Sequence, residues 1–204
     1  MFHRPQPGRR GLALLLFRDG APLAFVKLRD QGDPLGREAK ALARVHAYGP
    51  HSFSAPEVIA LDTTAGWWWL AFAPLPPRIH RAPRKPALEP ILEDIGAALE
   101  TLPRPTETPG HWLPMHGDFT PWNLREIPEV GLFLLDWEHV GWAPPGADRV
   151  LFRATVAAID GSAAARAGSA EAIDFWQEAM RDRTPGLGEQ RLADGLVRAF
   201  KEME

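Results

Sequence analysis

The sequence of 204 residues contains no cysteine. This absence excludes a disulfide framework, a thiolate zinc site, an iron–sulfur cluster and a cysteine nucleophile. Basic residues are not in surplus either, because 23 Lys and Arg stand against 26 Asp and Glu, for a formal net charge of −3. A protein that binds mainly nucleic acid or an anionic membrane surface normally carries a basic surplus. We therefore expect neither partner here.

Long apolar runs are also absent. The longest are Leu12–Phe17 and Trp67–Ala73, and a membrane-spanning helix needs roughly 18 residues or more. The first of these runs is too short for the apolar region of a signal peptide, and Arg18 and Asp19 follow it at once. We interpret it as a β-strand and expect a cytoplasmic protein. The oligomeric state is left open by the sequence.

The first third of the chain alternates apolar runs with turn residues. Two runs, Gly11–Phe17 and Leu23–Leu28, flank an Asp-Gly pair and predict a β-hairpin. Apolar positions at helical spacing and further strand-like runs predict a helix and two strands, in this order: Gly36–Ala47, Pro56–Asp62 and Trp67–Phe72.

A proline-rich, basic stretch over residues 74–86 follows and predicts an irregular connector. It has two interpretations, a solvated linker and a basic patch for a phosphorylated ligand. Beyond it, apolar spacing predicts further helices: Leu88–Leu102, Asp148–Asp160, Ala170–Arg181 and Glu189–Met203. Pro103 ends the first of them.

Three oxygen-bearing side chains stand at informative positions in the middle of the chain. Asp118 lies in a loop, Asn123 comes five residues later, and Asp136 ends the apolar run Leu132–Leu135, which we expect to be buried. A hairpin with its turn over Glu126–Gly131 would bring Asn123 and Asp136 together. Their hard oxygens suit Mg²⁺, and Asp118 could accept a proton from an attacking hydroxyl.

The segment His116–Asn123, HGDFTPWN, followed by Asp136-Trp137-Glu138, resembles the signature of aminoglycoside phosphotransferase and choline kinase-like enzymes. The resemblance implies an α+β, protein-kinase-like two-lobed fold, with a small antiparallel-sheet N-lobe and a mainly helical C-lobe. It implies an N-lobe over residues 1–73, a hinge or linker over 74–86 and a C-lobe over 87–204. The C-lobe would carry the catalytic loop at 116–123 and the metal-binding strand end at 136–138.

The resemblance also assigns roles to single residues. Asp118 would be catalytic, Asn123 and Asp136 would bind the metal, and Glu138 is a further candidate for the metal site. Lys27 would contact the nucleotide phosphates. Glu38 would be the partner of that lysine. Ala73 and Leu75 would hold the base at the hinge, and His116 and Asp148 would support the site structurally.

One feature of such kinases is missing. No Gly-x-Gly-x-x-Gly motif occurs, and only residues 1–10 precede the first predicted strand in this sequence. We therefore expect the glycine-loop strand to be absent from the N-lobe. Arg4, Arg9 and Arg10 are the residues that could replace part of its phosphate cover.

The leading hypothesis is a small-molecule kinase that transfers the γ-phosphoryl of ATP or GTP to a hydroxyl, with Mg²⁺ as cofactor. Its partners would be the nucleoside triphosphate and a small hydroxylated acceptor, whose identity the sequence leaves open. The alternative is a nucleotide-binding pseudokinase or scaffolding protein of the same fold. A third hypothesis is a metal-dependent phosphohydrolase that uses His116, Asp118, Asp136 and His139.

Overall fold

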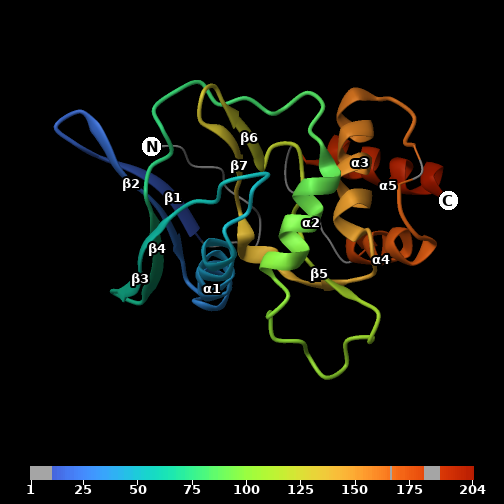
Figure 1. Ribbon diagram of the computed structural model, residues 1–204, viewed down its shortest axis with the longest axis horizontal. Coiled ribbons are helices and arrows are strands. Elements are labelled where there is room, and N and C mark those ends of the chain that lie inside the picture. The colour runs from blue at the N-terminus through green and yellow to red at the C-terminus, as the bar shows by residue number, and fades with distance from the viewer. Residues whose placement is uncertain (1–10, 166, 182–188) are drawn as a thin grey trace.

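The computed structural model describes residues 11–165, 167–181 and 189–204. A four-stranded antiparallel sheet lies at one end of the molecule and three helices lie at the other (Figure 1). The strand order in the sheet is β1-β2-β4-β3, from four strands: β1 (Gly11–Arg18), β2 (Ala21–Arg29), β3 (Val58–Thr64) and β4 (Trp67–Phe72).

The first two strands form the predicted hairpin. Asp19 and Gly20 connect them, with φ of 51° and 80°. Positive φ at both central residues matches the right-handed twist of the two strands, and Asp-Gly is a favoured pair there. Lys27 of β2 is opposite Ala13 of β1 on one side and Leu70 of β4 on the other, so the lysine lies on a central strand of the sheet.

Helix α1 (Asp33–Tyr48) connects β2 to β3 and covers one face of the sheet. A proline in its first turn is compatible with a helix start, which is why the helix begins before the predicted Gly36. Gly49 ends it in the left-handed conformation, and its N–H donates to the Val45 carbonyl. The buried face of the helix includes Glu38 among leucine, alanine and valine side chains.

The rest of the chain combines helices with short strand pairs. A 3₁₀ helix η1 (Trp137–His139) follows the second of two hairpin strands. The other elements are α2 (Leu88–Ala98), β5 (Leu113–Met115), β6 (Leu124–Ile127), β7 (Gly131–Leu134), β8 (Gly141–Ala143), α3 (Ala147–Asp160), α4 (Ala170–Arg181) and α5 (Gln190–Met203). Strand β5 pairs with β8, and β6 pairs with β7.

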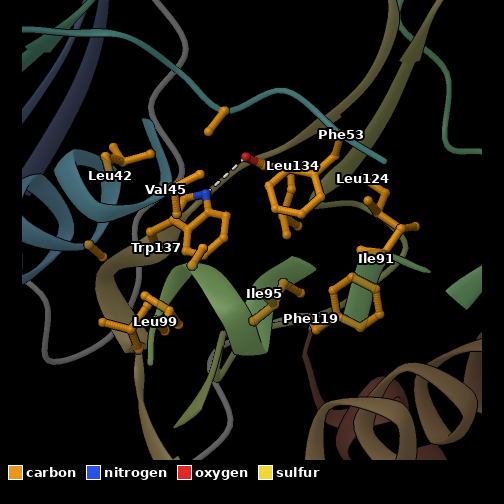
Figure 2. Packing of buried hydrophobic residues seen from close by; sticks show 14 of the residues in the cluster. Leu42, Val45, Phe53, Ile91, Ile95, Leu99, Phe119, Leu124, Leu134 and Trp137 are labelled. Atoms are coloured by element: carbon orange, nitrogen blue, oxygen red, sulfur yellow. Dashed lines mark hydrogen bonds between the residues drawn. The ribbon is translucent and has the colours of Figure 1, made fainter. Parts of the chain in front are cut away.

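The main core joins the sheet, α1 and α2 to the β6–β7 hairpin. Figure 2 shows Trp137 at its centre, between leucine and valine side chains of α1 and apolar side chains of α2. The Trp137 indole N–H donates to the Leu134 carbonyl at 3.0 Å, so this buried polar group is satisfied. A second core holds α3, α4 and α5 together.

The structure also differs from the sequence predictions at α2, at β3 and in the run Leu132–Leu135. Helix α2 ends at Ala98 and not at Leu102, because the chain turns at Leu99, which still packs into the core. Strand β3 begins at Val58, two residues after Pro56, which has no N–H to donate to a ladder. The run Leu132–Leu135 is only partly buried, since Leu134 alone is enclosed on all sides.

Within the described ranges, no helix is long and apolar enough to span a bilayer. The predicted phosphate-covering residues Arg4, Arg9 and Arg10 lie outside the described residues.

Candidate active site

The loop after β5 is fixed by a buried histidine. His116 is fully buried and accepts a hydrogen bond from the Asp118 N–H at its Nδ1, at 3.2 Å. Its Nε2 therefore carries the proton and donates to the Leu135 carbonyl at 3.1 Å. Burial lowers the pKa of His116 to about 4, so the ring is neutral near pH 7. His116 thus ties the loop to the end of the β6–β7 hairpin.

A buried carboxylate holds the same loop from the other side. Asp148, in the first turn of α3, accepts the backbone N–H of His116 at 2.7 Å and that of Gly117 at 3.0 Å. Burial raises the pKa of Asp148 to about 6, although the two hydrogen bonds act in the opposite direction. Two backbone groups that would otherwise be unsatisfied are paired in this way.

Gly117 is required by its surroundings. Its φ of 80° is in the left-handed region, and a Cβ there would lie 2.0 Å from the carbonyl oxygen of His139. Only glycine allows the loop to pass so close to the end of η1. The residue was not singled out from the sequence, although its place between His116 and Asp118 was a visible signal.

Asp118 and Asn123 lie against each other. The Asn123 amide donates to the Asp118 side chain at 2.9 Å and to the Asp118 backbone carbonyl at 2.8 Å. Because the amide nitrogen is used in both bonds, the carbonyl oxygen of the Asn123 side chain remains as an acceptor.

The β6–β7 hairpin brings Asn123 and Asp136 to the same end. Leu124 pairs with Leu134, and the Leu135 N–H donates to the Asn123 backbone carbonyl at 2.9 Å. Asp136 then adopts φ 66°, an uncommon conformation that Asp tolerates better than most residues. The turn ends the strand and starts η1, and the Asp136 side chain is 34% exposed.

Lys27 connects the sheet to this hairpin. Its ammonium lies 2.8 Å from both carboxylate oxygens of Glu38 and 2.7 Å from Oδ1 of Asp136. Burial would lower the pKa of Lys27, but the neighbouring carboxylates raise it above its ordinary value. Burial likewise would raise the pKa of Asp136, yet Lys27 holds it below the usual range. Lys27 and Asp136 are therefore charged near pH 7, whereas burial raises the pKa of Glu38 above its usual range although Lys27 acts in the opposite direction.

Glu138 belongs to an adjacent cluster. Its carboxylate lies 3.5 Å from the Arg29 guanidinium, and its backbone carbonyl accepts from Arg37 at 3.3 Å. One carboxylate oxygen from each of Glu38, Asp136 and Glu138 falls within 4.8 Å of the others. Sequence reasoning did not identify Arg29, although it follows Lys27 by two residues and so shares its strand face.

In the described part of the chain, Ala73 and Leu75 take no part in the hydrogen bonds of the Lys27 and Glu138 clusters. They line a cavity of about 430 Å³ with the end of α1, the chain that enters β3, and Phe133. The Ala73 N–H donates to the Glu57 carbonyl at 2.9 Å and continues the β3–β4 ladder. The two residues are thus at the exit of β4, where the chain leaves the sheet.

The sheet, the lysine–glutamate pair and the loop with its hairpin together define a kinase-like fold. The model of the phosphotransferase enzyme family (APH) matches residues 39–187. The chain belongs to this family of kinase-like phosphotransferases. No curated protein sequence matches the chain.

One solved structure supports the same fold. The chain is similar to the crystal structure of an aminoglycoside-3'-phosphotransferase of type VIII, with 19% identity and a TM-score of 0.50. That match covers 98% of this chain and 95% of the other. Two structures of the bifunctional kinase-methyltransferase WbdD also match, at 17% and 16% identity with TM-scores of 0.39 and 0.40. They cover 88% and 99% of this chain, which spans 40% and 44% of theirs.

Proposed function

We propose that the protein transfers the γ-phosphoryl group of a nucleoside triphosphate, ATP or GTP, to a hydroxyl of a small acceptor. The observation that carries the proposal is the position of Lys27. Its ammonium reaches a carboxylate of α1 and the carboxylate at the end of the hairpin, across a separation of 109 residues. Such a charge between the two parts of the fold suits the phosphates of a nucleotide.

In this proposal the nucleotide binds between the sheet and the hairpin. Lys27, held in place by Glu38, neutralises the phosphates that are not transferred. The Ala73 carbonyl and the Leu75 N–H are the backbone groups that we propose for the base, since Pro74 between them has no N–H.

The residues present fit a magnesium ion. Asn123 offers a carbonyl oxygen, because its amide nitrogen is engaged with Asp118, and Asp136 offers a carboxylate. These hard oxygens are ligands that Mg²⁺ prefers, and Glu138 is a further candidate. Bound there, Mg²⁺ would neutralise charge on the phosphate oxygens. Glu38 is less suited, since both of its oxygens face Lys27.

Asp118 is the proposed proton acceptor. Its carboxylate receives the proton of the acceptor hydroxyl while a new bond forms between that oxygen and the γ-phosphorus. The bond from the γ-phosphorus to the bridging oxygen breaks, and the nucleoside diphosphate leaves. The hydrogen bond that the Asn123 amide donates orients the Asp118 carboxylate for this step.

The test combines binding and transfer. Mg-ATP and Mg-GTP are titrated into the protein by calorimetry, and a panel of sugars, amino alcohols and nucleosides is screened for phosphorylation by ³¹P NMR. We expect Asp118→Asn to lower transfer by about 10²- to 10⁴-fold and to leave nucleotide affinity nearly unchanged. The exposed Asp174 provides the matched control, Asp174→Asn, which should change neither quantity.

The outcomes separate the hypotheses. Nucleotide binding without transfer to any acceptor would favour the pseudokinase alternative. Transfer by Asp118→Asn at the wild-type rate would show that the base is wrongly assigned. The phosphohydrolase hypothesis has lost a ligand, because both ring nitrogens of His116 are already engaged with the backbone.

A further inference from the structure

The β1–β2 hairpin extends away from the body of the molecule (Figure 1), and β1 is at the edge of the sheet. In the part of the chain that the structure describes, β1 pairs only with β2. Its second half is exposed although it is apolar: Leu15 is 45% exposed, Leu16 42% and Phe17 59%. These side chains alternate, so both faces of the strand present apolar surface.

Edge strands normally avoid such exposure. They carry charges, prolines or bulges that prevent pairing with another chain. Strand β3, at the opposite edge, contains Asp62, two threonines and a bulge near its start. Strand β1 has no charged residue from Gly11 to Phe17, and its ladder is regular as far as Leu16. A strand that is apolar on both faces is typical of the interior of a sheet.

A row of side chains across the sheet stops at this edge. Leu15 is opposite Phe25, and Phe25 is opposite Phe72, whose ring centroid lies 6.1 Å from that of Phe25. Burial decreases outward along the row, from Phe72 through the half-buried Phe25 to the exposed Leu15. The row lies on the face of Lys27, since residues two apart on β2 share a face.

We propose that a second copy of this chain pairs with β1, so that two sheets join across a two-fold axis at Leu15. An antiparallel pair of identical strands keeps each face of the sheet on its own side. Leu15 then meets Leu15 of the other copy and continues the row. Ala13 meets Phe17 of the other copy, which places the largest side chain of the strand against one of its smallest.

This register is favoured over one centred on Leu16 by the length of strand that it pairs, residues 12–18 and not only 14–18. It covers the three most exposed apolar side chains of the strand at the centre of the contact, where cross-strand pairs stabilise most. It places Arg18 opposite Leu12, so no like charges face each other in the contact. The contact is a closed pair, because the two-fold axis uses the free edge of both copies.

The primary test is the mass in solution. Sedimentation equilibrium over a range of concentrations should show reversible association of two 22.6-kDa chains. Leu15→Lys places a charge at the centre of the contact and should leave only monomer. The matched control is Leu61→Lys on β3. Leu61 is 38% exposed, against 45% for Leu15, and it also lies on an edge strand and on the same face of the sheet. It should dimerise like the wild type.

A second measurement tests the register. The chain has no cysteine, so Leu15→Cys introduces a single thiol that would face its own copy across the axis, within disulfide range. Incubation with oxidised glutathione should cross-link Leu15→Cys at least tenfold faster than Leu16→Cys, whose thiol lies on the other face opposite Leu14. Both variants should show the circular dichroism spectrum and melting temperature of the wild type.

Three results would overturn the proposal. One is a wild-type protein that is monomeric at every concentration, which would indicate that the edge is covered from within the same chain. Another is equal loss of dimer in Leu61→Lys and Leu15→Lys. The third is equal cross-linking at the two cysteine positions. None of these results depends on nucleotide binding, so they are independent of the proposed activity.

Discussion

The loop at 116–123 and the β1–β2 hairpin solve opposite problems. The loop carries polar side chains in a buried setting, and Asp148, His116 and Asn123 form hydrogen bonds that hold it on several sides. The hairpin carries apolar side chains in an exposed setting, and Leu15 and Phe17 are about half exposed. The loop is thus fixed by several contacts, whereas the hairpin leaves apolar surface uncovered.

The difference shows where rigidity is needed. A buried polar group costs free energy unless it is paired, so the loop can exist only in a surrounding that fixes it. Phosphoryl transfer depends on fixed positions of the reacting groups. The hairpin needs only its turn and its ladder to form, and its outer surface can be used for association.

Lys27 connects the two regions, because it belongs to the β1–β2 hairpin and its ammonium contacts Glu38 and Asp136. Lys27→Met removes the positive charge between Glu38 and Asp136, and unpaired buried charges destabilise by about 3–5 kcal/mol. We expect a large fall in melting temperature by calorimetry. Nucleotide affinity should fall about ten- to a hundredfold in the protein that remains folded, for one lost charge-assisted hydrogen bond.

Two further variants define the Lys27 effect. Lys40→Met, at an exposed position of α1, should leave stability and affinity unchanged. Lys27→Arg keeps the charge and should restore most of the stability. Nucleotide binding that survives Lys27→Met at full strength would place the phosphates elsewhere.

The next effect concerns pH and His116. Its folded pKa is about 4, below the ordinary 6.5, so the unfolded chain takes up a proton that the folded chain refuses. The stability from this group is present above pH 6.5 and is lost as pH falls toward 4. The loss is on the order of 3 kcal/mol. Urea unfolding at pH 7 and pH 4.5 measures it.

His116→Asn should remove that part of the pH dependence, whatever its own cost at pH 7. His51→Asn, at an exposed position, should retain it. Asp148 acts in the opposite direction between its ordinary pKa and its folded value of about 6, and it is present in both variants. An identical pH slope in the two variants would contradict the buried neutral histidine.

Two glycines compare the regions directly, because Gly117 and Gly20 share a φ of 80°. A Cβ at Gly20 in the hairpin turn meets nothing within 4 Å, whereas one at Gly117 would overlap the His139 carbonyl. Gly20→Ala should cost about 1 kcal/mol for the left-handed backbone alone. Gly117→Ala should cost about 1–3 kcal/mol more and reduce phosphoryl transfer. Equal melting temperatures of the two variants would refute the close contact.

The smallest expected effect is at the loop that follows α1. Asp94 of α2 accepts hydrogen bonds from the Ser52 hydroxyl at 2.6 Å and from the backbone N–H of Ser52 and His51. Asp94→Asn keeps the shape but loses the charge, and should cost about 1 kcal/mol. The exposed neighbour provides the control, Glu93→Gln, which should be neutral in the same urea titration.

Much of this fold could be predicted from local patterns. The Asp19-Gly20 turn, helix α4 and the β6–β7 hairpin all follow from residues that are close in the chain. The three-residue strands β5 and β8 could not be predicted, because neither has an apolar alternation of its own and each forms only by pairing with the other. The left-handed conformation of Asp136 gave no signal either, since no glycine marks it.

The sequence by itself determined the family signature and the chemical types at the site. The order of Asp118, Asn123 and Asp136 is readable because the loop and hairpin that carry them are local structures. The resemblance implied Glu38 as the partner of Lys27. Only the tertiary structure decided that Asp136 contacts the same ammonium, and that Arg29 pairs with Glu138. It also decided that β1 is left at an exposed edge. Such contacts join distant segments, and they depend on how the sheet packs against the helical core, which no local pattern encodes.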